Sequence, residues 1–129
     1  MVEVVLHEIS PPQQQEPPRR ERTLGSLREA RHVIEHAVRQ VFDVAADDFA
    51  AVNRGVARTA QARQVAMYLA HVAWRITLTD VGRMFGRDRT TVAHACAVVE
   101  DERDDPSFDR ALDLLEWAVT AMARRRAGE

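Results

Sequence analysis

The sequence predicts an all-α fold, a single helical domain of five to six helices, and three observations support this. The chain has 129 residues, 46% of them apolar, which is enough to bury one core but not two. Apolar residues recur at helical spacing in several separate segments. Between Thr77 and Asp88 a capping signal, a turn glycine and a second capping signal follow one another, and this order is typical of a helix-turn-helix.

The first 23 residues are predicted to form a disordered N-terminal arm. They hold four of the five prolines and a run of three glutamines. Val2, Val4 and Leu6 alternate with polar neighbours, so a short strand or interaction arm remains the alternative. We expect the folded domain to cover residues 24–124 and a tail to follow at 125–129.

Two helices are expected before the helix-turn-helix. Ser26, with Glu29 three residues later, fits a capping box for a helix that runs to about Phe42. Asp47 or Asp48 is expected to start a short helical turn, which ends at Asn53-Arg54-Gly55. A mostly buried helix is then predicted over Ala60–Trp74, because few of its side chains are polar.

The helix-turn-helix follows from local signals. Thr77 and Asp80 form a capping box, and Gly86 ends the short helix that begins near Leu78. Asp88 can cap the second helix. The expected buried side chains are Val81, Met84 and Phe85 on the first helix and Val92, Ala95, Cys96 and Val99 on the second.

A closing helix is predicted after Asp105, because a capping residue followed by Pro106 is a favoured helix start. Its apolar stripe would comprise Phe108, Ala111, Leu112, Leu115, Ala118, Val119 and Met122.

Four polar residues crowd the start of the second helix of the motif: Arg87, Arg89, Thr90 and Thr91. They cannot all lie in the core. Donors at the exposed end of a rigid helix are what a recognition helix presents to base edges in the major groove of DNA.

Three segments carry a resemblance to a known family: A-R-Q-V-A-M-Y-L-A at 62–70, L-T-D-V-G-R-M-F-G-R-D at 78–88 and R-D-R-T-T-V-A-H-A-C at 87–96. They resemble the C-terminal DNA-binding domain of the bacterial chromosomal replication initiator, DnaA, from about Leu27 to about Met122. The resemblance implies a Trp-repressor-like or replication-initiator-like helical domain without the ATPase part. Arg89 stands where the family has His, and the turn is one residue shorter than the usual F-G-G-R-D.

The resemblance also implies which residues contact DNA. Arg63 and Gln64 match a family pair that contacts the phosphate backbone, and a loop arginine enters the minor groove, with Arg54 favoured and Arg58 second. The full set of candidate DNA-binding residues is Arg54, Arg58, Arg63, Gln64, Thr79, Arg87, Asp88, Arg89, Thr90 and Thr91.

Composition limits the function classes. The formal net charge is −2, yet seven arginines and only two aspartates lie between Arg54 and Arg89, so one basic face on an acidic body is expected. The chain has no lysine, which excludes a Walker A phosphate loop, so neither the ATPase part of the initiator nor a bound nucleotide is expected. One cysteine and no signal or membrane-span pattern favour a cytoplasmic protein associated with the nucleoid.

No catalytic set, cofactor or metal site is predicted. His32 and His36 are spaced for a shared metal but lack further ligands, and His94 and Cys96 point away from each other on a helix. Tyr68 and Trp74 are expected to pack in the core or at its rim. The predicted partner is double-stranded DNA; the alternative is a protein-interaction module that uses the closing helix or the N-terminal arm.

Overall fold

The computed structural model describes residues 23–42 and 56–126, and in these ranges it has five helices and no strand. They are α2 (Leu24–Phe42), α3 (Val56–Val72), α4 (Leu78–Phe85), α5 (Arg89–Glu102) and α6 (Pro106–Arg126). The predicted all-α fold is therefore confirmed. The limits proposed for the arm, the domain and the tail stay predictions, since the arm before Thr23 and the helical turn near Asp47 lie outside the described residues.

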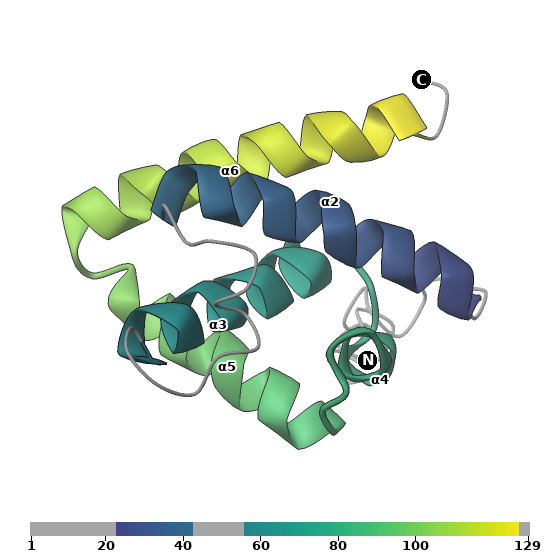
Figure 1. Ribbon diagram of the computed structural model, residues 1–129. Helices are drawn as coiled ribbons and strands as arrows, with labels where there is room; N and C mark the ends of the chain where they lie inside the picture. The colour runs from purple at the N-terminus through teal and green to yellow at the C-terminus, as the bar shows by residue number, and fades with distance from the viewer. Residues whose placement is uncertain (1–22, 43–55, 127–129) are drawn as a thin grey trace, which may run out of the picture.

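Helix α3 is the centre of the fold, because it contacts each of the other four helices. Figure 1 shows it beneath α2, with α6 along one side of the molecule and the α4–α5 turn on the other. Seven of its residues between Ala62 and Ala70 are buried on all sides of the helix. A helix without a solvent-facing stripe has to be surrounded by others, and this explains its place.

Two predicted helix boundaries are wrong. Helix α2 begins at Leu24, and its cap is Thr23, whose Oγ1 accepts a hydrogen bond from the Ser26 amide at 3.1 Å. Ser26 is thus the donor in the first turn rather than the cap. Helix α3 begins at Val56, four residues before the predicted start. It ends at Val72, and three residues later Arg75 adopts a left-handed conformation with φ 60°.

The predicted apolar stripes are largely confirmed. Val81, Met84 and Phe85 of α4 are buried, as are three of the four expected positions on α5, while Cys96 is half-buried. On α6 the fully buried positions are Leu112, Leu115 and Val119. Tyr68 lies in the core, and the Trp74 indole packs at its rim, where Nε1 donates to the Val119 carbonyl at 2.6 Å.

Candidate nucleic-acid interface

The first helix of the motif, α4, is bounded by its own residues. Thr77 Oγ1 accepts a hydrogen bond from the Asp80 amide at 3.1 Å, and Gly86 ends the helix in the left-handed region with φ 66°. Glycine adopts that conformation without the steric cost that other residues incur. The cap at Thr77 and the stop at Gly86 are confirmed, and they fix the residue at which the turn begins, while the Asp80 carboxylate pairs with Arg83 at 2.9 Å.

Helix α5 starts at Arg89 because Asp88 caps it. Its Oδ1 accepts hydrogen bonds from the Thr91 amide at 2.8 Å and from the Thr90 hydroxyl at 2.7 Å. These bonds, that from Thr90 foremost, lower the pKa of Asp88. Asp88 Oδ1 therefore secures the start of α5, while the carboxylate itself stays exposed.

The turn is tight at Gly82. A β-carbon on this residue would collide with the carbonyl oxygen of Arg87, and the Arg87 amide donates back to the Gly82 carbonyl at 2.9 Å. The chain can cross so close to α4 only where no side chain intervenes. Gly82 therefore fixes the position of Arg87 and Asp88 relative to α4.

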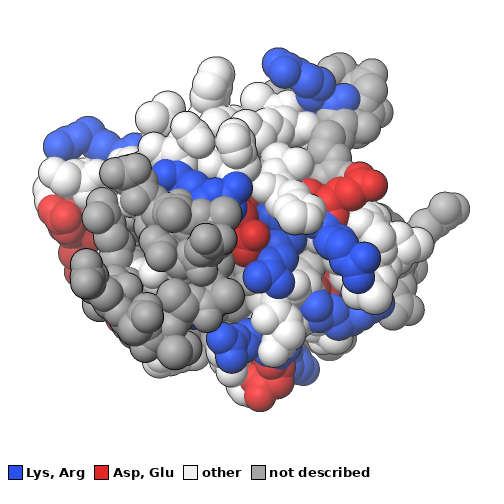
Figure 2. Space-filling model, in the orientation of Figure 1, with Lys and Arg blue, Asp and Glu red and all other residues white. Residues whose placement is uncertain are grey.

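The predicted polar residues of the turn and of α5 reach solvent together. Arg87, Asp88, Arg89, Thr90 and Thr91 are all exposed, and Thr79 is exposed on α4. In Figure 2, arginines gather across the middle and lower part of one face, over α4 and the start of α5. This surface has the composition of a recognition-helix end.

Arg63 and Gln64 are half-buried on α3, two turns after its start at Val56. Because α3 begins at Val56 and not at the predicted Ala60, these two residues lie inside the helix, and the dipole at its N-terminus does not explain an anion site there. Arg63 is nevertheless near the turn, as the charges that act on it indicate. Burial lowers its pKa, and so do the positive charges of Arg87 and Arg31, while Glu35 acts in the opposite direction. Arg63 thus lies within electrostatic range of the turn.

The side chains of the two arginines expected in the minor groove are not described. Arg54 lies outside the described residues, and Arg58 falls in the first turn of α3, where only the backbone is described. The choice between them stays a prediction.

One residue at this surface was missed by the sequence reasoning. Arg31 of α2 donates from Nη1 to the carbonyl of Met84 at 2.9 Å and lies over the Phe85 ring, with Cζ 4.8 Å from the ring centroid. Its Nε forms an ion pair with Glu35 at 2.8 Å. The i, i+4 spacing of Arg31 and Glu35 was the only signal in the sequence, and it gave no hint of a contact with α4.

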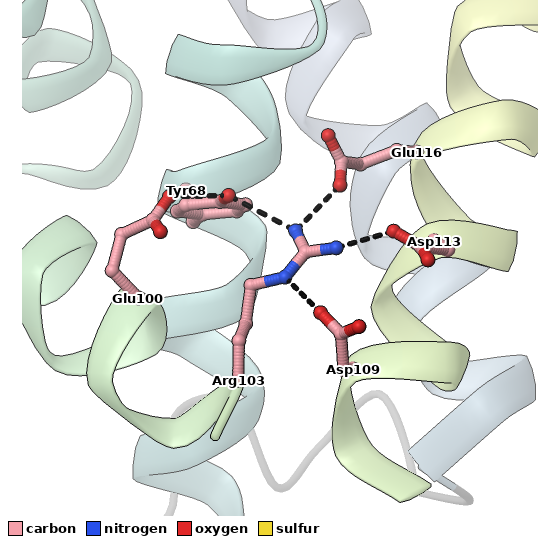
Figure 3. A network of polar contacts seen from close by, with 6 residues as sticks. All are labelled: Tyr68, Glu100, Arg103, Asp109, Asp113 and Glu116. Atoms are coloured by element: carbon pink, nitrogen blue, oxygen red, sulfur yellow. Dashed lines mark hydrogen bonds and ion pairs between the residues drawn. The ribbon is translucent and has the colours of Figure 1, made fainter. Parts of the chain in front are cut away.

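A second polar network lies away from the turn, where α3, α5 and α6 meet (Figure 3). Arg103 donates to Asp109 at 2.6 Å, to Glu116 at 2.6 Å, to Asp113 and to the Tyr68 hydroxyl at 3.1 Å. Tyr68 in turn donates to Glu100 at 2.7 Å. Burial alone would lower the pKa of Arg103, but its bonds to Glu116, Asp109 and Tyr68 outweigh burial and raise it.

Among the described residues there is neither a metal-binding cluster nor a reactive thiol. Within them no three His, Cys, Asp or Glu side chains gather to hold a metal, and His32 and His36 are exposed beside a groove that Val33, Met122 and Arg125 also line. Burial, followed by the charge of Glu100, raises the pKa of Cys96 to about 11, which disfavours the reactive thiolate. Among the described helices, none has the length and apolar character needed to cross a bilayer.

Comparison with known proteins agrees with this geometry. Residues 32–99 match the family model of the bacterial dnaA protein helix-turn-helix. The chain is 40% identical over 92 residues to the chromosomal replication initiator protein DnaA of Bartonella quintana, which covers 70% of this chain and 18% of that protein. The corresponding protein of Lachnoclostridium phytofermentans is 49% identical over 55 residues, covering 41% of this chain and 12% of that protein.

A solved structure, of replication initiator DnaA bound to AMPPCP and single-stranded DNA, matches with a TM-score of 0.63 at 30% identity. The match covers 74% of this chain and 29% of that one. The chain spans less than a fifth of the length of these two curated relatives. From the helix-turn-helix geometry and these matches together, the chain belongs to the bacterial DnaA helix-turn-helix family, whose C-terminal domain binds DNA and is not catalytic.

Proposed function

We propose that this protein reads a specific sequence in double-stranded DNA. The start of α5 would enter the major groove, and Arg54 or Arg58 would enter the minor groove. The observation that carries the proposal is the exposed group of Arg87, Arg89, Thr90 and Thr91 at the capped end of a rigid helix, with Arg63 in electrostatic range. Arginine donors at such an end suit base edges and phosphates, and the Thr90 hydroxyl, which donates to Asp88, can still accept a hydrogen bond from a base amino group.

Binding at sites like those of the initiator would make this protein a regulator of replication initiation or of transcription, acting in the cytoplasm on the nucleoid. The two roles require the same contacts and differ only in where the sites lie. In this proposal Arg63 and Gln64 position the duplex, and Thr79 adds a polar contact from α4.

Arg89 determines the expected target. Its planar guanidinium matches the O6 and N7 acceptors of guanine, a contact worth about 1–3 kcal/mol of discrimination. We therefore propose a G·C pair where the family's His makes its contact. The competing possibility is that the shortened turn directs Arg89 to a phosphate.

The test is selection of binding sites from random duplex DNA by the native chain and by Arg89→His in parallel. A change of base preference at one position, from G toward the base that the His variant selects, supports direct reading. Two identical site preferences that differ only in affinity and salt dependence would show that Arg89 holds the backbone.

The salt dependence of binding tests the contact with phosphates. If about four to six phosphates are neutralised, log K should fall with log salt with a slope near four or five in magnitude, at roughly 0.9 per contact. Arg63→Ala should weaken all sequences alike, whereas Thr90→Ala should weaken chiefly the selected site. Arg110→Ala is the matched control, since Arg110 is exposed on α6, the helix that runs along the opposite side of the molecule from the α4–α5 turn. A flat salt profile would refute DNA binding by this surface.

A second function is favoured by one observation on α6. Leu114 and Trp117 are 58% and 71% exposed on this helix. They lie three positions apart and so share one face of α6, and a contiguous exposed apolar patch is typical of a surface that contacts another protein. If no duplex from the random pool is retained even at low salt, this interaction role of the closing helix becomes the better proposal.

A further inference from the structure

Arg31 links the first described helix to the end of α4. Its guanidinium makes three contacts: with Glu35 on its own helix, with the Met84 carbonyl and with the face of the Phe85 ring. Met84 and Phe85 are the last two residues of α4, directly before Gly86. A single side chain from α2 thus holds the residues that lead into the turn.

Each contact has a physical reason to be stable. The last carbonyls of a helix have no hydrogen-bond donor within the helix, and they carry its partial negative charge. A guanidinium supplies both a donor and a positive charge. An arginine over an aromatic ring gains a further cation–π attraction. Glu35 is only 7% exposed, and its ion pair with Nε keeps the guanidinium in the orientation that reaches α4.

The position of the turn depends on this end of α4. Arg87 is bonded to the Gly82 carbonyl, and its own carbonyl lies against Gly82, so the turn follows α4 as a unit. Asp88 then starts α5 directly after Arg87. A shift of Met84 and Phe85 relative to α2 would therefore move the exposed end of α5.

We propose that Arg31 is a positioning residue for sequence recognition: it fixes the helix-turn-helix against α2 and sharpens the choice between DNA sequences without contacting DNA. This inference rests on the proposed function. Arg31 also lies near enough to Arg63 for its charge to lower that residue's pKa, so its contact with α4 must be separated experimentally from a direct contact with phosphate.

Three variants separate these roles. Arg31→Met keeps a long side chain over Phe85 but removes the donors and the charge. Arg31→Lys keeps the charge, although an ammonium lacks the planar fork that bonds Glu35 and Met84 together. Arg28→Met is the matched control, because Arg28 is exposed on the same helix three residues earlier. All are compared well below their own melting temperatures.

For Arg31→Met we expect the ratio of affinities for the selected site and for random DNA to fall roughly tenfold, about 1.4 kcal/mol, with the salt slope unchanged. Arg31→Lys should be intermediate, and Arg28→Met should match the native chain. Should Arg31→Met fail to fold, the ratio for Arg31→Lys decides, and a native ratio would overturn the inference.

Two results would overturn the inference while leaving the proposed function intact. A salt slope lower by about 0.9 would make Arg31 a phosphate contact. An unchanged ratio in the folded Arg31→Met variant would leave Arg31 with a role in stability only. A native chain that selects no site overturns the proposed function first, and the inference with it.

Discussion

Two arginines show how differently this protein uses one residue type. Arg103 lies among acceptors from α3 and α6, which raise its pKa against the effect of burial. Arg63 is also partly buried, but the groups that act on it include two further arginines, and its pKa is lowered. The charge of Arg103 is balanced by carboxylates of the fold, whereas Arg63 lies near two other positive charges.

The difference separates the surface proposed to bind DNA, around Arg63, from the acidic surroundings of Arg103. At Arg63, burial and the charges of Arg87 and Arg31 lower the pKa, and the charge of Glu35 acts against them. In the proposed function, a phosphate near Arg63 and Arg87 would add a favourable charge there. At Arg103 an incoming anion would meet Asp109, Asp113 and Glu116 instead, so the two ends of the molecule should respond in opposite ways to substitution.

The largest expected effect is on the acidic end. Arg103→Met leaves three carboxylates and the Tyr68 hydroxyl without their shared donor. The free energy of unfolding should fall by about 2–3 kcal/mol, between the values typical of exposed and of buried ion pairs. Urea denaturation measures this, with Arg110→Met as a control that should change little. A loss of DNA discrimination in the folded variant would contradict the separation of the two ends.

The second effect is on the turn. Gly82→Ala sets a methyl group against the Arg87 carbonyl, and we expect a loss of about 2 kcal/mol in stability, as for other overpacked sites. Its affinity for the selected site should fall in addition, because the turn must move. Gly25→Ala is the control: its added carbon meets nothing within 4 Å, and it should stabilise α2 by about 0.5 kcal/mol. Equal affinity in the two variants would show that the turn adapts without cost.

The smallest expected effect is the loss of stability when the Tyr68 hydroxyl loses its proton. Burial and the bond to Glu100 raise the pKa of Tyr68 from 10.0 to about 12. Because the folded state holds this proton more tightly, the contribution to stability is complete below pH 10.0 and is lost as the pH rises to about 12. Tyr68 is the only tyrosine, so the tyrosinate absorbance reports it alone. A midpoint near 10.0 in the folded chain would show that the network around Arg103 is open to water.

The parts of the fold that the sequence predicts well are those encoded by neighbouring residues. Thr77, Gly86 and Asp88 mark the ends of α4 and α5 because each cap bonds within three or four positions. Ser26 was misleading, because its spacing to Glu29 fits a capping box while Thr23 makes the actual bond. The start of α3 was missed because the break expected at Gly55 gave no reason to extend the helix back to Val56.

The contacts that orient the candidate site are not local. Arg31 meets Met84 across 53 positions, and Arg103 meets Tyr68 across 35. In the sequence Arg103 stands as a lone cation within an acidic run, and its partners become evident only when α6 returns past α3 and α5. The exposed arginines and threonines of the turn could be predicted, but the proximity of Arg63 to Arg87 required the fold.

The cap of α5 has a consequence for how such a protein can change its target over generations. The helix start is secured by the Asp88 carboxylate and by the backbone amide of Thr91, whereas the side chain of Arg89 lies outside that bond. If Arg89 reads a base as proposed, substitution at this position would alter the base preference with little loss of folding stability. Arg89, at the position where the resemblance to the family implies histidine, would be an instance: one substitution would change the target while the start of the helix stays capped.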